Sequence, residues 1–224
     1  MRKLSYVMLL CTAVAISSCA QKGYQQLSKG ETLKGWHTYN KTGVGAAWTI
    51  KDGVFHLDPT VKGGRGDLVT DKEYSNFDLT YDWKVAPGSN SGLIFNVHED
   101  PKYSETYSTG IEMQVLDNDG HSDGKNPKHR AGDLYDLISS SSEPVKPVGD
   151  WNKARIVSNN GNLTLFLNGV QIVKTTMWDE SWSKLVAGSK FASWKNWGTF
   201  HKGKIALQDH GGEMWYKNIS IKEL

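Results

Sequence analysis

The sequence predicts a single all-β domain, either a sandwich or a jelly roll. Short segments of alternating apolar and polar residues recur at a spacing of roughly ten residues along most of the chain. Several of these segments are separated by Asp-Gly or Asn-Gly pairs, which favour tight β-hairpins. The sequence contains no long amphipathic helix, internal repeat or linker, so one compact β-structure is expected.

The first strands follow from alternation and turn residues. Asp52-Gly53 predicts a hairpin that joins strands at 48–50 and 54–57. The glycine-rich stretch 62–67 lacks the lysine-serine ending of a phosphate-binding loop, so we interpret it only as a loop before a short strand at 67–70. Residues 77–85 alternate almost perfectly, which predicts a strand with one apolar face.

The second half of the chain continues the pattern. After a turn at 87–92, Leu93, Phe95 and Val97 are expected on one face of a strand. A polar segment at 118–131 is long for a loop, and long loops are often functional. Residues 181–200 are predicted to be irregular or partly helical. The remaining strands are expected, in chain order, at 110–117, 133–138, 150–157, 163–167, 170–173, 204–208 and 214–221.

The N-terminal segment 1–19 has the features of a secretory signal peptide. Arg2 and Lys3 precede an apolar stretch that ends in Ser17-Ser18-Cys19. This ending resembles a bacterial lipobox, so we expect lipidation at Cys19 and a tether at 20–26 before the domain at 27–224. The alternative is an ordinary signal peptide cut near Ala20. The absence of acidic residues just after Cys19 favours a lipid anchor in the cell envelope on the periplasmic side.

Composition narrows the classes of function. Both cysteines, Cys11 and Cys19, lie in the leader, so the mature domain is expected to have no disulfide and no thiolate chemistry. A net charge of +2 without a basic cluster does not suggest nucleic-acid binding. Nine Trp and nine Tyr in a polar chain fit contact with carbohydrate, although individual rings more often belong to the core.

Two polar rows are the main candidates for a functional site. Glu112 and Gln114 alternate with apolar residues, so they should point away from the core on one strand face. Gln208 and His210 repeat this arrangement near the C-terminus. A carboxylate and an imidazole can transfer protons, and amides can bind sugar hydroxyls. The alternative is that these residues form ordinary solvated strand faces.

The loop that begins at Asp117 weakly resembles a cation site. Oxygen-bearing residues alternate around a glycine from Asp117 to Gly124, but Lys128 stands where a calcium loop would have its last glutamate. Asp117 with His121 and His129 could instead bind a transition metal. A hydrophilic loop with Asx turns is the simpler interpretation.

Several motifs together resemble the 3-keto-disaccharide hydrolase family, long catalogued as a domain of unknown function. The resemblance covers about residues 24–224 and is strongest to exported members from gut-type Bacteroidetes. One departure is Tyr216-Lys217, where an aromatic residue followed by arginine is expected. The motifs are Asn90-Ser91-Gly92, Gly110-x-Glu112-x-Gln114-x-x-Asp117-Asn118, Gly132-x-x-Tyr135, Trp151-Asn152, Leu167-Asn168-Gly169, Leu207-Gln208-Asp209-His210-Gly211 and Asn218-Ile219-x-Ile221.

The resemblance implies a concanavalin-like jelly roll and action on glycosides that already carry a ketone at C3. Such a ketone acidifies the C2 hydrogen, so a base can form an enolate and the aglycone can leave from C1. Glu112 and His210 are the candidate acid and base, in either order. The candidate substrate-binding residues are Gln114, Gln208, Asn90, Tyr135, Lys190 and Trp194. A divalent metal, with Asp117 and His121 as its candidate ligands, could stabilise the enolate.

Two other functions remain open at this stage. The same fold could serve as a non-catalytic, lectin-like glycan-binding module, because fold does not determine function. The chain could also be a lipoprotein subunit that only supports a partner oxidoreductase. Catalysis is favoured because Glu112 and His210 add titratable groups that a module binding through rings and amides does not need.

Overall fold

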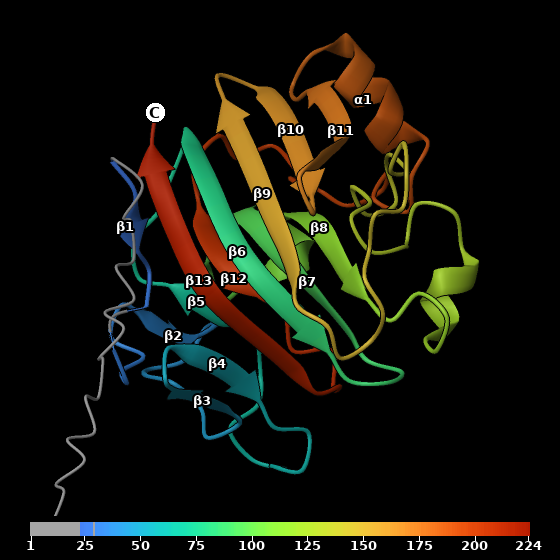
Figure 1. The fold of residues 1–224 in the computed structure, drawn as a ribbon. Coiled ribbons are helices and arrows are strands. Elements are labelled where there is room, and N and C mark those ends of the chain that lie inside the picture. Colours follow the sequence, from blue (N-terminus) through green and yellow to red (C-terminus); the bar gives the residue numbers. More distant parts are fainter. Residues whose placement is uncertain (1–22, 29) are drawn as a thin grey trace, which may run out of the picture.

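A computed structural model shows two antiparallel β-sheets packed face to face (Figure 1). The structure describes residues 23–28 and 30–224. The predicted signal peptide, the lipidation residue Cys19 and the start of the predicted tether lie outside the described residues. The arrangement confirms the predicted all-β, concanavalin-like jelly roll. None of the helices in the described part is long and apolar enough to cross a membrane.

The larger sheet has eight strands, in the order β11-β10-β9-β6-β13-β4-β3, with β1 paired to β13. The bounds of these strands are β1 (Gln25–Gln26), β3 (Trp48–Lys51), β4 (Val54–Leu57), β6 (Phe77–Val85), β9 (Asn152–Asn159), β10 (Asn162–Leu167), β11 (Val170–Thr176) and β13 (Met214–Glu223). Because β1 pairs with Ser220 and Ile221, the last two residues of the predicted tether belong to the sheet.

The smaller sheet has five strands, in the order β2-β5-β12-β7-β8. Their bounds are β2 (Trp36–Thr38), β5 (Leu68–Thr70), β7 (Asn90–Val97), β8 (Ile111–Leu116) and β12 (Lys204–Leu207). Three short helices complete the described chain: η1 (Thr106–Ser108), η2 (Ser122–Lys125) and α1 (Glu180–Ala187). Helix α1 confirms the partly helical character predicted for 181–200, and it begins where Asp179 accepts a hydrogen bond from the Trp182 N–H.

The predicted hairpins are confirmed by their turn geometry. Asp52 and Gly53 join β3 to β4, and both have positive φ angles, of 51° and 72°. Asn168 and Gly169 join β10 to β11 with φ angles of 49° and 84°. Positive φ at both central residues is the type I′ geometry whose twist matches that of the flanking strands.

The main core fills the space between the two sheets and includes the predicted apolar face of β6, from Phe77 to Val85. The predicted grouping of Val97 with Leu93 and Phe95 is wrong. Leu93 and Phe95 enter the main core, but Val97 lies on the opposite face of its sheet. Asn96 has a φ angle of 55°, and the pairing with β12 shifts register there, so a bulge reverses the last residue of β7.

The prediction of a strand at 133–138 is also wrong. This segment consists of turns with isolated bridges from Leu134 to Met113 and Ile138. Both oxygens of the Asp133 carboxylate accept backbone N–H groups, from Arg130 at 2.8 Å and Ser140 at 2.7 Å. These side-chain to backbone bonds replace a ladder and fold the segment back on itself.

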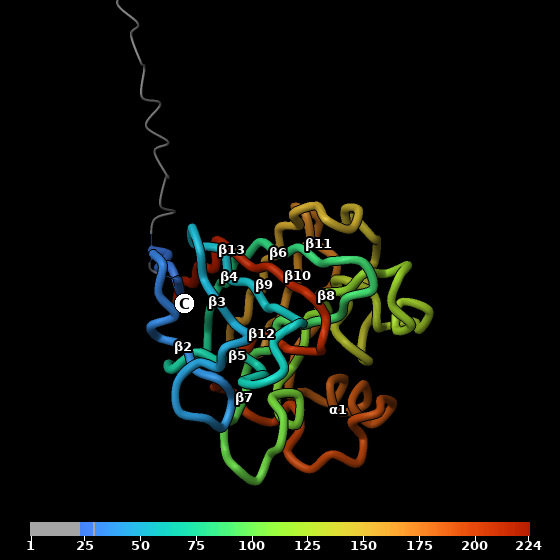
Figure 2. Tube along the Cα trace, turned by 90° about the horizontal axis from the view of Figure 1, so that it is seen from below, coloured from blue at the N-terminus to red at the C-terminus, as the bar shows by residue number. Residues whose placement is uncertain are grey.

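The face of the five-stranded sheet that turns away from the main core is the outer face. A small apolar cluster lies on it, which we call the outer patch: Tyr39, Val69, Ile94, Val97 and Ala206. In Figure 2, the loop after β2, the loop around η1 and the segment carrying α1 all extend beyond this sheet on the side away from the larger sheet. The outer face is therefore not flat, because these segments rise above the sheet.

Candidate active site

A cleft of about 440 Å³ lies on the outer face of the five-stranded sheet. It gathers both predicted polar rows, although these rows are far apart in the sequence. The predicted residues that line it are Asn90, Glu112, Gln114, Tyr135, Lys190, Gln208 and His210. Trp194, Asp117 and His121 do not line the cleft, although the His121 ring lies 5.8 Å from that of His210.

Strand β8 supplies the floor of the cleft. Ile111, Met113 and Val115 enter the main core, so Glu112 and Gln114 point to the outer face, as their alternation predicts. Both are nevertheless buried, because surrounding loops enclose them. The cleft floor is therefore a recess in which polar groups are shielded from water.

Gly92 leaves room for the Glu112 carboxylate. In the ladder between β7 and β8, Gly92 pairs with Gln114 and the next outward residue, Ile94, pairs with Glu112. A β-carbon added at Gly92 would overlap the Glu112 carboxylate itself. The glycine thus lets the carboxylate lie directly over the neighbouring backbone.

Two amide groups on the floor have polar atoms without partners. Asn90 Oδ1 and Gln114 Nε2 are buried, yet neither makes a hydrogen bond to any residue that the structure describes. Leaving such groups unpaired costs about 1–3 kcal/mol each. A buried acceptor and a buried donor in one cleft suit a ligand that offers both hydroxyl hydrogens and oxygens, as a sugar does.

The Glu112 carboxyl has a strongly altered acidity. Burial raises its pKa to about 8, Lys190 opposes this rise, and the nearby Asp67 and Asp123 carboxylates add to it. A carboxyl group with this pKa is a much stronger base, once ionised, than one in water. Such tuning toward the working pH is typical of acid–base catalysts.

Lys190 reaches the cleft from the segment that follows α1. Its backbone N–H donates to Asp136 Oδ2 at 2.6 Å, and its Nζ lies 4.0 Å from the centre of the Tyr135 ring. Burial lowers the pKa of Lys190, although the carboxyl groups of Glu112, Asp136 and Asp123 counteract this. The Tyr135 ring therefore serves as a cation–π support for this ammonium group.

The Tyr135 hydroxyl is itself hydrogen-bonded within the protein. It donates to Asp123 Oδ2 at 3.2 Å, and its ring stacks on His129 with 4.3 Å between the ring centres. Burial, followed by the charge of Asp123, raises the pKa of Tyr135. Tyr135 therefore positions Lys190 rather than providing a free phenol for proton transfer.

Gln208 and His210 line the cleft, but not as members of a strand. Strand β12 ends at Leu207, and the chain then leaves the ladder. The Gln208 N–H still donates to the Gly92 carbonyl at 3.0 Å, which holds the start of this segment against β7. Gln208 is consequently buried, whereas His210 is exposed at the edge of the cleft.

The glycine-rich loop contributes residues that the sequence reading left without a role. Asp67 Oδ1 accepts the Asp209 N–H at 2.8 Å, and its other oxygen accepts the Thr106 hydroxyl. Burial raises the pKa of Asp67 to about 7. Arg65 from the same loop pairs with the Asp209 carboxylate. Asp67 therefore ties together the segments before β5, after β12 and at η1.

Other lining residues were also missed. These are Glu105, Tyr107, Phe191 and Asp209. Asp209 lies inside the Leu207–Gly211 motif and Phe191 follows Lys190, so both stood beside predicted residues. Glu105 precedes the short helix η1 and Tyr107 belongs to it, and this segment has no alternation or turn signal that would have indicated a site.

Trp194 lies at the rim of the cleft and does not line it. Its ring is 6.1 Å from that of Tyr107, and these two side chains are 37% and 36% exposed. The Phe191 ring, which does line the cleft, contacts Trp194 edge-on at 5.3 Å. The rim therefore carries an exposed aromatic pair of the kind that sugars contact.

The residues predicted to bind a metal do not fit that role in their present arrangement. The Asp117 carboxylate accepts N–H groups from Gly88 at 2.7 Å and Gly120 at 2.9 Å. Burial alone would raise the pKa of Asp117, but these backbone donors hold it below its ordinary value. His121 Nδ1 accepts the Asp123 N–H. No group of three or more candidate ligands is present among the described residues.

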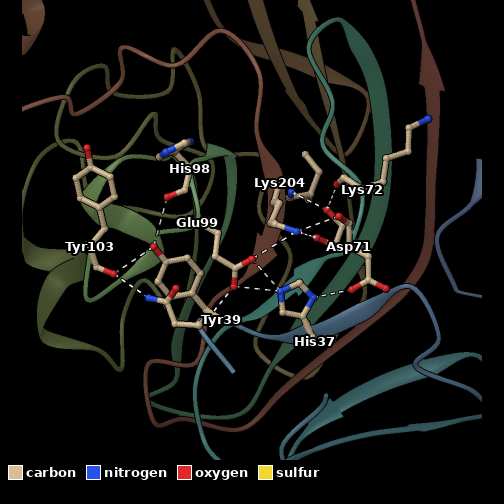
Figure 3. Close-up of polar contacts among 11 residues, drawn as sticks. His37, Tyr39, Asp71, Lys72, His98, Glu99, Tyr103 and Lys204 are labelled. Atoms are coloured by element: carbon tan, nitrogen blue, oxygen red, sulfur yellow. Dashed lines mark hydrogen bonds and ion pairs between the residues drawn. The ribbon is translucent and has the colours of Figure 1, made fainter. Parts of the chain in front are cut away.

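A second polar cluster occupies the other end of the outer face (Figure 3). We call it the His37 network, and it consists of His37, Asp71, Glu99 and Lys204. His37 contacts Asp71 at 2.6 Å through Nδ1 and Glu99 at 2.9 Å through Nε2. Lys204 Nζ donates to the carbonyls of Thr70 and Asp71 and lies 3.4 Å from Glu99.

The two packed sheets and the amide-lined cleft define a β-sandwich protein with a polar site on its outer face. A family model for a 3-keto-alpha-glucoside-1,2-lyase-like domain matches residues 23–222. A protein from Bacteroides thetaiotaomicron named 3-keto-disaccharide hydrolase is 33% identical over 229 residues, which is 90% of this chain and 79% of that protein. The chain belongs to this family, as its motifs predicted.

Solved structures agree with this assignment. A candidate glycosyl hydrolase from Parabacteroides distasonis has a TM-score of 0.83 at 30% identity, over 90% of this chain and 94% of that one. The carbohydrate binding module CBM66 from Bacillus subtilis has a TM-score of 0.53 at 12% identity, over 84% and 96% of the two chains, and shares the fold alone. Family and relatives together support an enzyme of the glycoside hydrolase type.

Proposed function

We propose that this protein cleaves 3-keto-glucosides by removing the C2 proton and expelling the aglycone from C1. The observation that carries the proposal is that the buried Glu112 carboxyl group and the exposed Lys190 side chain line the same cleft. The two side chains line one recess and are close enough for the ammonium group to oppose the rise in the Glu112 pKa. A basic carboxylate next to a cation is what enolisation beside a ketone requires.

Each step can be assigned to a residue. The Glu112 carboxylate takes the proton from C2, and the electron pair forms an enolate whose oxygen faces the Lys190 ammonium. The enolate then reforms the ketone as the C1–O bond breaks and a C1=C2 double bond appears. His210 gives a proton to the leaving oxygen, since it lies at the open edge of the cleft.

Water addition restores both catalytic groups. Neutral His210 accepts a proton from a water that adds to C1, and protonated Glu112 returns a proton to C2. The sum of the steps is hydrolysis, whereas release of the unsaturated sugar before water adds would make the enzyme a lyase. Buried Asn90, Gln114 and Gln208 would bind hydroxyls, and Tyr107 with Trp194 would contact a sugar face at the rim.

The cleft favours this chemistry over ordinary glycosidase chemistry. A conventional site needs one ionised carboxylate and one protonated carboxyl beside the scissile bond. Here the pKa values of the two buried carboxyl groups, Glu112 and Asp67, are both raised, to about 8 and about 7. Asp209 is held by Arg65 and by backbone N–H groups. Among the described carboxyl groups that line the cleft, this leaves the exposed Glu105 as the one candidate for a free nucleophile, so the pair of free carboxyl groups that conventional chemistry uses is not formed.

The first test is NMR of the purified protein with a 3-keto-glucoside in deuterated water. Release of aglycone with deuterium at C2, or formation of an unsaturated keto-sugar, is expected. A parallel sample with a chelator tests whether a divalent metal takes part. Substrate signals that broaden without any product would instead support a glycan-binding module.

Export and anchoring remain part of the proposal. We expect Cys19 to carry a lipid that holds the domain in the cell envelope, facing the periplasm. Labelled fatty acid should be incorporated by the wild type and by Cys11→Ser, but not by Cys19→Ser. Equal labelling of all three proteins would contradict lipidation at Cys19.

A further inference from the structure

We propose that the outward side of the larger sheet docks on a membrane surface that contains anionic lipids. We call this side the basic face. It consists of the side chains on the larger sheet that alternate with those of the main core. Figure 1 shows the larger sheet in front of the smaller one, so the basic face is turned toward the viewer. The inference concerns a surface away from the cleft and does not depend on the chemistry proposed there.

The strands of the basic face carry seven cationic side chains and two carboxylates. Both carboxylates are hydrogen-bonded, because Asp78 pairs with Arg155 and Asp82 Oδ2 accepts Asn218 Nδ2 at 2.6 Å. The other six cations are lysines, and the ion pairs that lysines form in the described chain all belong to other lysines. The six are Lys51, Lys84, Lys153, Lys174, Lys217 and Lys222.

The fold, and not the sequence order, gathers these lysines. Lys153 and Arg155 alternate with the core residues Ala154 and Ile156, and the other lysines come from four further strands. Because neighbouring strands lie only about 4.8 Å apart, the charges form one field although they are scattered along the chain. Each lysine near an anionic membrane strengthens binding by about fivefold. A chain with a net charge of +2 thus presents one strongly positive side.

Two tryptophans lie among these lysines. Trp215 pairs in register with His56 on one side and with Lys84 on the other. Its ring stacks on His56 with 5.2 Å between the ring centres, and Lys84 Nζ lies 4.2 Å from the Trp215 ring. Lys217 Nζ lies 4.0 Å from the ring of Trp151. Amphipathic indoles beside lysines are typical of protein surfaces at the headgroup level of a membrane.

The described chain begins on this same face. The Tyr24 hydroxyl donates to Asp78, and burial followed by this bond raises the pKa of Tyr24 to about 12. A β-carbon added at Gly23 would lie 3.5 Å from the Lys222 side chain. Cys19, the proposed lipidation residue, precedes Gly23 by four residues, which span at most about 14 Å. A lipid there would bring the basic face to the membrane, and a lipid with a basic patch binds more firmly than either alone.

The cleft opens on the opposite side of the sandwich. It lies on the outer face of the five-stranded sheet, whereas the basic face belongs to the larger sheet. Figure 2 shows α1 and the loops beyond the smaller sheet on the far side from β6 and β13. Docking through the basic face therefore leaves the cleft open to soluble substrate.

The test uses residues 20–224, which retain every described strand and helix and contain no cysteine. This chain is mixed with vesicles of phosphatidylcholine, with or without phosphatidylglycerol, at about 0.1 M salt, where charges act over about 10 Å. We expect cosedimentation only with the vesicles that contain phosphatidylglycerol. Salt at about 1 M should release the protein, because the screening length then falls to about 3 Å.

Two pairs of substitutions separate the basic face from total charge. Lys153→Gln with Lys174→Gln should weaken partitioning to the anionic vesicles about 30-fold, as the loss of two lysines predicts. Both side chains are exposed, so the melting temperature should not change. Lys184→Gln with Lys195→Gln removes the same charge from the exposed segment that carries α1, and should leave partitioning nearly unchanged.

A footprint tests the orientation on the vesicle. Asn162→Cys at the exposed start of β10 and Ala192→Cys beside the cleft residue Phe191 each introduce a single thiol. Anionic vesicles should slow the reaction of the first thiol with a water-soluble maleimide. The second thiol should react as fast as it does without vesicles.

The outcomes are exclusive. No binding, equal binding to both kinds of vesicle, equal losses in the two lysine pairs, or protection of the Ala192→Cys thiol instead would overturn the membrane-docking surface. Tighter binding to polygalacturonate than to anionic vesicles, at matched negative charge, would assign the face to acidic polysaccharides and overturn it as well. Lipidation of Cys19 and glycoside cleavage have their own tests, so the failure of one proposal leaves the others standing.

Discussion

The two ends of the outer face carry similar residues in opposite states. At one end, the His37 network joins two carboxylates, an imidazole and an ammonium group by hydrogen bonds and ion pairs (Figure 3). At the other end, the cleft holds a buried carboxyl group that faces a lysine, together with amide atoms that have no partners. The same strands supply both ends, since Asp67 precedes β5 and Asp71 follows it.

The difference separates structural polar groups from functional ones. The network satisfies its charges within the protein, so its contribution is to stability. The cleft leaves its polar atoms unpaired, which costs stability and is repaid only when a ligand binds. The pKa values of the two glutamates support this distinction. Burial would raise the pKa of Glu99, but hydrogen bonds from Asn40 and His37 lower it. Burial raises the pKa of Glu112.

The largest expected effect comes from exchanging one glutamate at each end. Glu112→Gln should lower kcat/KM by about 10²–10⁴-fold, because the C2 base is lost, without lowering the melting temperature. Glu99→Gln should do the reverse and cost roughly 1–3 kcal/mol in the free energy of unfolding, with little change in turnover. Steady-state kinetics and chemical denaturation measure the two quantities. Similar behaviour of the two variants would remove the distinction.

The second comparison is between Lys190 in the cleft and Lys204 in the His37 network. Lys190→Met should reduce kcat/KM by about 10²–10³-fold, as expected when one stabiliser of a developing oxyanion is removed. Because Lys190 opposes the rise in the Glu112 pKa, its loss should also move the ascending limb of the pH–rate profile to higher pH. Lys204→Met, the matched change in the network, should lower stability and leave the profile in place. An unmoved limb in Lys190→Met would show that the two groups do not interact.

Substitutions at two glycines test how tightly the Glu112 carboxylate is packed against the cleft floor. Gly92→Ala should displace the Glu112 carboxylate and lower kcat/KM by roughly ten- to 100-fold. Gly63→Ala is the control, since a β-carbon there would meet no atom within 4 Å. Normal kinetics in Gly92→Ala would mean that the carboxylate can occupy another position and still act.

The smallest effect is the pH dependence of stability, which should have opposite signs at the two ends. The Glu112 pKa is raised from 4.5 to about 8, so its contribution to stability is complete below pH 4.5 and declines as pH rises toward about 8. The Glu99 pKa is lowered, so its contribution is present above 4.5 and is lost as pH falls through its folded-state pKa.

Denaturation across pH 3–9 checks both signs with the glutamine variants. Glu112→Gln should be less sensitive than the wild type between about pH 4.5 and 8. Glu99→Gln should be less sensitive in acid. Parallel curves for the wild type and either variant would contradict the acidity assigned to that residue.

Much of this arrangement could be predicted from the sequence, because it depends on local signals. Alternation placed Glu112 and Gln114 opposite the core, and the Asp-Gly and Asn-Gly pairs fixed the hairpins. The repeated polar row suggested that Gln208 and His210 share a site with Glu112 and Gln114, and the motif resemblance supplied the family. These features depend on neighbouring residues in the chain or on motifs that can be compared directly.

What could not be predicted depends on contacts between distant segments. The bulge at Asn96, which reverses Val97, is set by the pairing with β12. The turns at 133–138 depend on how the Asp133 carboxylate bonds to backbone N–H groups. Asp67 enters the site because it bonds to Asp209, 142 residues away, and no local pattern reports such a contact.

The outer patch has a consequence for how this enzyme can change over time. Its five apolar side chains lie between the network and the cleft, and Ile94 pairs directly with Glu112. Four of its side chains have no polar atom, whereas the pKa of the fifth, Tyr39, is raised by burial and also by the carboxylates of Glu99 in the network and Glu105 in the cleft. Mutations that adjust the stability of one end and the substrate range of the other are therefore expected to act separately, except where they pass through Tyr39.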